Sequence, residues 1–209
     1  MAAPRRVRLQ TDERRAQLLE LGSRIFSTRA YDDISIDDVT AAAGISKGLL
    51  YHYFPGKREF YVEVIREAWM QLRRLTEPDT SLPPGARLRA AVDAHLNYVE
   101  QHGPVYAAIY RGGAAIADEV GAILEEHRER VMGYFVRDLG VGKPTPVLRA
   151  ALRGWIALVE GISLDYIAHP EVGREALCEL IIKAYASMLD KAASLDPRTA
   201  RALKKSARR

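Results

Sequence analysis

The sequence predicts an all-α protein of about nine helices. Apolar residues recur at helical spacing along the chain, and we find no sustained strict alternation with β-branched residues. Most prolines fall between these periodic segments or in a first helical turn, where proline is tolerated. The helices are expected near residues 12–29, 36–43, 47–53, 57–76, 85–102, 104–111, 115–139, 147–168 and 172–194.

Composition excludes several classes of protein. The 209 residues are 48% hydrophobic and 28% charged, which is typical of a globular chain. A single cysteine, Cys178, excludes a scaffold held by intramolecular disulfides. A secretory signal requires an apolar run after its basic residues, and none follows the arginines at the start. No stretch of 18 apolar residues is free of charged residues, so no membrane-spanning helix is predicted. We therefore expect a cytoplasmic protein with no membrane partner.

The net charge of +4 is concentrated at the two ends of the chain. Residues 1–30 hold seven arginines against three acids, and residues 191–209 hold seven basic residues against one acid. Basic ends fit an anionic partner, although short basic tails can also be merely solubilising. We interpret residues 1–11, with Arg5, Arg6 and Arg8, as a flexible arm that can lie along phosphate. Residues 196–209 are interpreted as a solvated basic tail.

The first helix has one apolar face. Thr11 or Asp12 is its expected N-cap. Its apolar residues share one arc at 100° per residue, as in an amphipathic helix; they are Leu18, Leu21, Gly22, Ile25 and Phe26.

The stretch from Ile34 to Lys57 carries signals for two short helices joined by a turn. Ser35 and Asp38 have the spacing of a capping box, with aspartate in place of the usual glutamate or glutamine. Gly44 is suited to the left-handed conformation that ends a helix, and Ser46 caps the next helix at once. This arrangement is a helix-turn-helix.

The second helix of the pair is two-sided. Leu50 and Phe54 form an apolar i,i+4 pair, joined by Tyr53. Another face offers a cation, bare backbone, a phenol and an imidazole within about 140° of arc, from Lys47, Gly48, Tyr51 and His52. Such groups suit a recognition helix in a DNA major groove. Lys57 follows at the start of the next helix, where it can meet a backbone phosphate.

The run from Ser46 to Lys57, Ser-Lys-Gly-Leu-Leu-Tyr-His-Tyr-Phe-Pro-Gly-Lys, resembles the signature of the TetR family of bacterial transcriptional regulators. The resemblance covers about residues 12–70. It implies a homodimer on a roughly palindromic double-stranded DNA operator. The positions that match the family's DNA contacts are Ser35, Ser46, Lys47, Gly48, Tyr51, His52, Tyr53 and Lys57.

Three positions of this run leave alternatives open. Leu49 departs from the family pattern, which often has a polar residue there, so it contacts a thymine methyl or leaves base reading to its neighbours. For Tyr53 the alternative is core packing, which we favour over DNA contact. For His52 the alternative is a solvated surface imidazole.

We expect a DNA-binding domain over residues 12–56, with its motif near 34–53, and an effector-binding and dimerisation domain over residues 57–195. The last two long helices are apolar over much of their girth, which indicates burial on two sides. One side then faces a partner subunit, unless the pair is a buried hairpin of a monomer. The expected interface residues are Gly154, Ala157, Gly161, Ile181, Tyr185 and Met188.

Polar groups on apolar helix faces indicate an effector site in the middle helices, since mostly apolar pockets with a few polar groups bind small molecules. The alternative is that these groups are satisfied within the core or at helix ends. No two of the histidines have the i,i+4 spacing of a helical metal site, so we predict no metal. The candidate residues are His95, His102, Tyr106, Tyr110, His127, Trp155 and Tyr166.

No motif for catalysis or for a cofactor is found: the chain has no Gly-x-Ser-x-Gly, no phosphate-binding glycine loop and no His-Glu-x-x-His. The function expected is a regulator, most simply a repressor, released from its operator by a small, mostly apolar effector. The alternatives are an activator of the same family, or a helical small-molecule or lipid-binding protein without a transcriptional role.

Overall fold

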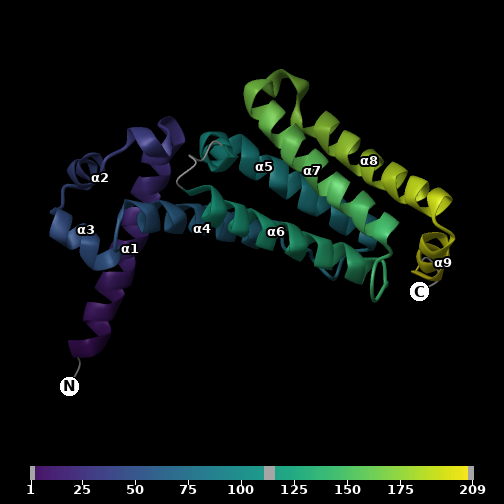
Figure 1. The fold of residues 1–209 in the computed structure, drawn as a ribbon, viewed down its shortest axis with the longest axis horizontal. Helices are drawn as coiled ribbons and strands as arrows, with labels where there is room; N and C mark the ends of the chain where they lie inside the picture. Colours follow the sequence, from purple (N-terminus) through teal and green to yellow (C-terminus); the bar gives the residue numbers. More distant parts are fainter. Residues whose placement is uncertain (1–2, 111–115, 207–209) are drawn as a thin grey trace. The chain divides into compact units, whose positions relative to one another are not determined.

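The computed structural model describes the backbone of residues 3–110 and 116–206 and the side chains of residues 12–110 and 116–205. The described backbone forms nine α-helices and no strand, which confirms the predicted fold class (Figure 1). None of its helices is long and apolar enough to cross a membrane. The helices are α1 (Ala3–Thr28), α2 (Ile36–Ala43), α3 (Lys47–Tyr53), α4 (Lys57–Leu75), α5 (Pro84–Tyr110), α6 (Ala117–Asp138), α7 (Pro146–Ala168), α8 (Arg174–Leu195) and α9 (Pro197–Ser206).

The number of helices agrees with the prediction, but the set differs. The segments expected as 85–102 and 104–111 form one helix, α5, with a break at His102 (φ −126°, ψ 22°) and Pro104 inside. Proline breaks a helix locally but does not prevent the helix from resuming beyond it. The expected helix ends at residues 111 and 115 lie outside the described residues.

The two ends of the chain also differ from expectation. α1 begins at Ala3, so the expected cap at Thr11 or Asp12 is wrong, and the stretch interpreted as a flexible arm is helical from residue 3. The side chains of its arginines lie outside the described residues. The expected tail contains α9, and its Lys204 and Lys205 are exposed.

Helix α9 is held by polar contacts at its start. Asp196 precedes Pro197, and its carboxylate accepts hydrogen bonds from Arg198 N (2.9 Å) and Thr199 Oγ1 (2.8 Å). The Thr199 side chain is fully buried, with its Oγ1 2.5 Å from Oγ1 of Thr145, the N-cap of α7. Hydrogen bonds from Thr145 and Thr199 lower the pKa of Asp196 to about 2. This part of the predicted solvated tail is therefore packed structure.

The chain divides into two compact units, and each combines separate stretches of sequence. Unit 1 contains Met1–Gln71 with Pro104–Ile123, and unit 2 contains Leu72–Gly103 with Leu124–Arg209. This division differs from the expected linear boundary at residue 57. The reason is that α4 is integral to the core of unit 1.

The core of unit 1 is aromatic. Phe26 of α1 lies against two rings of α4, with ring centroids 5.9 Å from Phe60 and 4.6 Å from Tyr61. All three side chains are at most 2% exposed. Gly22 of α1 faces the same helix, and a Cβ added there would lie 2.5 Å from Val64 Cγ2 and 2.7 Å from Phe60 Cζ. Glycine therefore allows α1 and α4 to pack closely.

Substituting Gly22 by alanine is expected to destabilise unit 1 by about 1–3 kcal/mol, since overpacking outweighs the higher helix propensity of alanine. Urea unfolding followed by circular dichroism measures the change. Gly133→Ala in α6 is the control, because an added Cβ there meets no described heavy atom within 4 Å. Equal or greater stability of Gly22→Ala would contradict the close packing.

In unit 2, α7 and α8 lie side by side (Figure 1). The indole N–H of Trp155 donates to the carbonyl oxygen of Ile181 across this pair, at 2.9 Å. Phe135 and Tyr185 pack on the same indole, with ring centroids 4.9 and 5.4 Å away. Burial raises the pKa of the Tyr185 hydroxyl, which stays neutral in this surrounding.

Candidate functional site

The helix-turn-helix of unit 1 has the local geometry that the sequence predicts. Asp38 N donates to Ser35 Oγ (3.1 Å), and the Asp38 carboxylate accepts from Ser35 N (2.8 Å), which completes the capping box. Gly44 ends α2 in the left-handed conformation (φ 62°, ψ 36°). Ser46 caps α3 and accepts from Leu49 N at 3.2 Å. The ends of α2 and the start of α3 are thus set by contacts within residues 35–49.

Helix α3 is two-sided, as expected. Leu50 and Phe54 are buried, at 1% and 2% exposed, and they anchor the helix inward. The opposite side is exposed and carries the predicted DNA-facing groups, namely Lys47, Gly48, Tyr51 and His52. Leu49 is also exposed, at 37%, so an apolar side chain lies among the polar ones.

Tyr53 lies at the border of the two sides. Its side chain is half-buried, and its ring contacts those of His52 and Phe54, with centroids 5.2 and 6.4 Å away. The ring therefore packs on the anchoring face while its neighbour His52 is exposed.

Two lysines flank this surface, and each has a partner within unit 1. Lys47 Nζ lies 2.7 Å from Asp37 Oδ1 of α2, and this hydrogen bond raises the pKa of the lysine. Both side chains are more than half exposed, so water screens the pair and its net stabilisation is small. Lys57 Nζ lies over the ring of Tyr31, 4.1 Å from its centroid.

In unit 2, two of the predicted ligand-site residues form a polar cluster with a serine. His95 Nε2 of α5 lies 2.9 Å from Ser163 Oγ of α7, and Ser163 donates to the carbonyl of Val159 at 2.8 Å. Because that hydroxyl has one proton, it accepts from His95 Nε2 and leaves Nδ1 as the acceptor nitrogen. Burial lowers the pKa of His95 to about 3, with a smaller effect from His127. Burial also lowers the pKa of His127 to about 4.

The other predicted ligand-site residues are dispersed. Trp155 and Tyr166 are buried, and their polar groups donate to the Ile181 carbonyl and to Glu100, the latter at 2.5 Å. His102 stacks on Tyr98 at the break in α5. Tyr106 and Tyr110 belong to unit 1, with their hydroxyls 3.5 Å apart. The best candidates are therefore His95 and His127, with Ser163, which the sequence reading missed although it lies four residues after the buried Val159.

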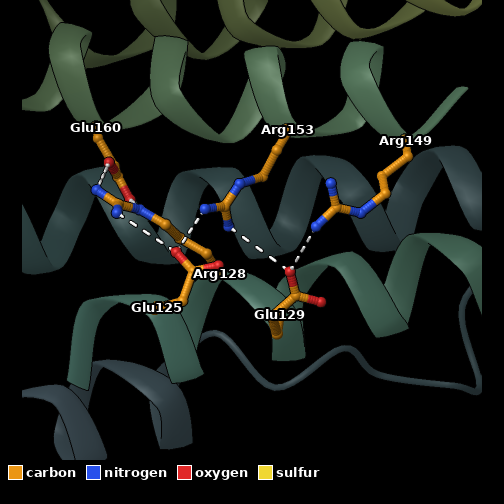
Figure 2. A network of polar contacts seen from close by, with 6 residues as sticks. All are labelled: Glu125, Arg128, Glu129, Arg149, Arg153 and Glu160. Carbon is orange, nitrogen blue, oxygen red and sulfur yellow. Dashed lines mark hydrogen bonds and ion pairs between the residues drawn. The ribbon is translucent and has the colours of Figure 1, made fainter. Parts of the chain in front are cut away.

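An ion-pair network, also missed, joins α6 to α7 (Figure 2). Arg128 donates two hydrogen bonds to the carboxylate of Glu160, at 2.8 and 2.7 Å. Arg153 contacts Glu125 at 2.5 Å and lowers the pKa of that carboxyl. Arg149 and Glu129 add a longer contact of 3.4 Å. The bidentate Arg128–Glu160 pair is the least exposed of these contacts, with side chains 27% and 12% exposed.

The predicted dimer residues fall into three groups by exposure. Gly154, Ala157 and Gly161 of α7 are exposed, whereas Ile181 is fully buried in its own protomer and cannot reach a partner chain. Tyr185 and Met188 are half-buried, the former against Trp155. The described residues contain no group of three or more histidine, cysteine or acidic side chains placed to hold a metal ion.

Comparison with known proteins agrees with this geometry. Residues 18–64 match the family described as "Bacterial regulatory proteins, tetR family", and residues 84–188 match "Tetracyclin repressor-like, C-terminal domain". A crystal structure of a TetR-family transcriptional regulator from Streptomyces coelicolor is 30% identical, with a TM-score of 0.82 over 94% of this chain and 89% of that one. The chain belongs to the TetR family.

Curated relatives match over shorter stretches. The transcriptional activator FasR of Mycolicibacterium smegmatis is 31% identical over 145 residues, which are 64% of each chain. The transcriptional repressor DhaR of a Mycobacterium species is 34% identical over 92 residues, 43% of this chain and 46% of that protein. The chain thus spans less than two thirds of either regulator.

Proposed function

We propose that the protein is a ligand-responsive transcriptional regulator that binds a palindromic operator as a homodimer and is released by a small, mostly apolar effector. The observation that carries the DNA-binding part is the two-sided α3, anchored by Leu50 and Phe54, with exposed hydrogen-bonding groups on its other side. Such a helix places side chains against base edges in the major groove. This role places the protein with the DNA, in the cytoplasm.

The homodimer is supported by the exposed small residues of α7. A Cβ added at Gly161 meets no described heavy atom within 4 Å, and Gly154 is likewise exposed. Leu180 of the adjacent α8 is also exposed, at 53%. A second copy covering both helices buries this surface. It also presents two copies of α3 to successive major grooves.

The effector site is supported by the cluster of His95, Ser163 and His127. These polar groups come from three helices of unit 2, and burial keeps both imidazoles neutral. A mostly apolar molecule with one polar end suits such a surrounding. Three helices, α4, α5 and α6, contribute residues to both units, so an effector that favours one arrangement of these helices changes the affinity for DNA.

Repression is the simpler reading, because a dimer bound at an operator blocks access to it without any further contact. Activation is the second candidate, favoured by one observation: the matched relative FasR is named an activator. Transcription from a promoter carrying the operator, with and without the protein, separates the two.

The test is the binding of a palindromic duplex from the DNA next to the protein's own gene, measured by fluorescence anisotropy at several salt concentrations. Lys47→Ala is expected to lower the affinity about five- to tenfold and to flatten the salt slope by about 1 per protomer, since one phosphate contact is lost. Asp37→Asn is expected to have the opposite effect on DNA affinity, because it removes the carboxylate charge that pairs with Lys47. It should raise the affinity for all duplexes by a few-fold.

Two results would contradict the proposal. One is a parent protein whose binding to the duplex does not depend on salt. The other is Lys47→Ala and Asp37→Asn proteins that both bind like the parent. The first result would favour a helical small-molecule-binding protein without a transcriptional role, whereas the second would show that Lys47 is not a DNA contact.

A further inference from the structure

Lys57, the first residue of α4, rests on an aromatic ring. Its ammonium nitrogen lies 4.1 Å from the centroid of Tyr31, and both side chains are half-buried. An ammonium over a ring face is attracted to the negative face of the ring, more strongly where water is partly excluded. The lysine side chain, which is otherwise mobile, is therefore held in one place before any DNA arrives.

The ring of Tyr31 itself packs against the buried aromatic core of unit 1. It makes an edge contact with Tyr61, with centroids 5.0 Å apart and planes at 66°. Tyr61 is 2% exposed, packs edge-on against Phe26, and its hydroxyl contacts the Ala108 carbonyl at 3.4 Å. Burial raises the pKa of the Tyr31 hydroxyl, so the ring stays neutral and keeps its face for the cation. The platform under Lys57 is thus built on the core of unit 1.

The neighbouring cation does not compete for the same role. Arg58, next along α4, pairs with the carboxylate of Glu119 at the start of α6. Its charge is therefore partly offset, whereas Lys57 has an uncharged partner that leaves its full charge in place. Lys57 also lies in the first turn of a helix, where backbone N–H groups lack intrahelical acceptors and favour an anion.

We propose that Tyr31 is a positioning residue that pre-orders Lys57 for a DNA backbone phosphate. The proposal rests on the DNA-binding function proposed above. The ring covers one side of the ammonium and leaves its other N–H groups for the phosphate. Ordering the lysine in the free protein removes part of the entropy cost that binding would otherwise carry. Because phosphates carry no sequence information, the effect is equal for specific and non-specific duplexes.

The test is a double-mutant cycle on duplex affinity with Tyr31→Leu, Lys57→Gln and the double variant. Tyr31→Leu is expected to weaken both specific and non-specific duplexes about three- to tenfold. Tyr31→Phe, which keeps the ring, should bind within about twofold of the parent. The double variant should bind no more weakly than Lys57→Gln alone, because Tyr31 acts through the lysine.

A purely structural role for Tyr31 gives a different pattern. The losses from Tyr31→Leu and Lys57→Gln would then add, and that result overturns the proposal. So does a Tyr31→Leu protein that binds like the parent. A parent protein that binds no duplex overturns both this proposal and the DNA-binding function, whereas additive losses in a parent that binds overturn this proposal alone.

A second measurement covers the case in which Tyr31→Leu does not fold. In the parent and in Tyr31→Phe, the ring face should shift the proton resonances of the Lys57 ε-methylene upfield relative to those of the exposed Lys143. Resonances of Lys57 at the position of an exposed lysine in the parent would overturn the proposal.

Discussion

Replacing Gly161 by glutamate is expected to convert the proposed dimer into a monomer and to weaken operator binding at least about 100-fold. The side chain would enter the proposed interface, where an unpaired carboxylate loses its hydration without a partner, at a cost of about 3 kcal/mol or more. The protomer itself should tolerate the change, since an added Cβ at this exposed position of α7 meets no described heavy atom within 4 Å. Sedimentation velocity at micromolar concentration measures the association, and anisotropy measures the DNA affinity.

Gly133 of α6 provides a matched control. It is also an exposed helical glycine of unit 2 with no described heavy atom within 4 Å of an added Cβ, but it lies outside α7 and α8. Gly133→Glu should therefore remain a dimer and bind the operator like the parent. A Gly161→Glu protein with unchanged association, or a parent that is monomeric at micromolar concentration, would show that this face of α7 is not the interface.

The geometry of α2 and α3 could be predicted because the signals that place these helices are local. Ser35, Gly44 and Ser46 fix two short helices through contacts within a few residues, so their identity in the sequence is nearly sufficient. The apolar pair Leu50 and Phe54 then decides which side of α3 turns inward. All of these steps depend on spacing along one short segment, which a sequence displays directly.

Unit 2 was harder to predict because its polar contacts join distant segments. Glu160 is buried against Arg128, 32 residues away, and Ser163 meets His95 across 68 residues. Neither of these two pairings can be predicted from the spacing of residues in the sequence. Helical periodicity places His95 and His127 on apolar faces, but it does not indicate that Ser163 is the partner of His95.

The end of the chain shows how composition can mislead. Asp196 followed by Pro197 is a helix-start signal, with a capping carboxylate and a proline in the first turn. The basic character of the following residues indicated a solvated tail. The contact between Thr199 and Thr145, 54 residues apart, supplies the packing that a ten-residue helix does not have alone.

Lowering the pH from 7 to 5 is expected to destabilise unit 2 by about 3 kcal/mol. In the folded protein the pKa values of His95 and His127 are about 3 and about 4, below the ordinary value of 6.5. As the pH falls below 6.5, the unfolded chain binds protons that the folded chain does not, so the unfolded state is favoured. Between pH 6.5 and pH 5, each histidine lowers the free energy of unfolding by roughly 1 kcal/mol per pH unit.

Carboxylates do not account for a loss between pH 7 and pH 5. Hydrogen bonds and ion pairs lower the pKa values of Glu125 and Asp196 in the folded state. Their contribution is present above the unfolded pKa near 4 and is lost only as the pH falls further. The window from pH 7 to pH 5 therefore isolates the buried imidazoles, whose neighbours include the cations Arg128 and Arg130 beside His127.

Urea unfolding at pH 7, 6 and 5 measures the change. A Trp69→Phe background leaves Trp155 of unit 2 as the one tryptophan in the sequence, so its fluorescence reports on that unit. The double variant His95→Gln and His127→Gln should lose most of the dependence on pH, whereas His52→Gln, at an exposed position of α3, should retain it. If the double variant keeps the slope of the parent, these imidazoles are not buried in the neutral form. The polar centre proposed for the effector would then have to lie elsewhere in unit 2.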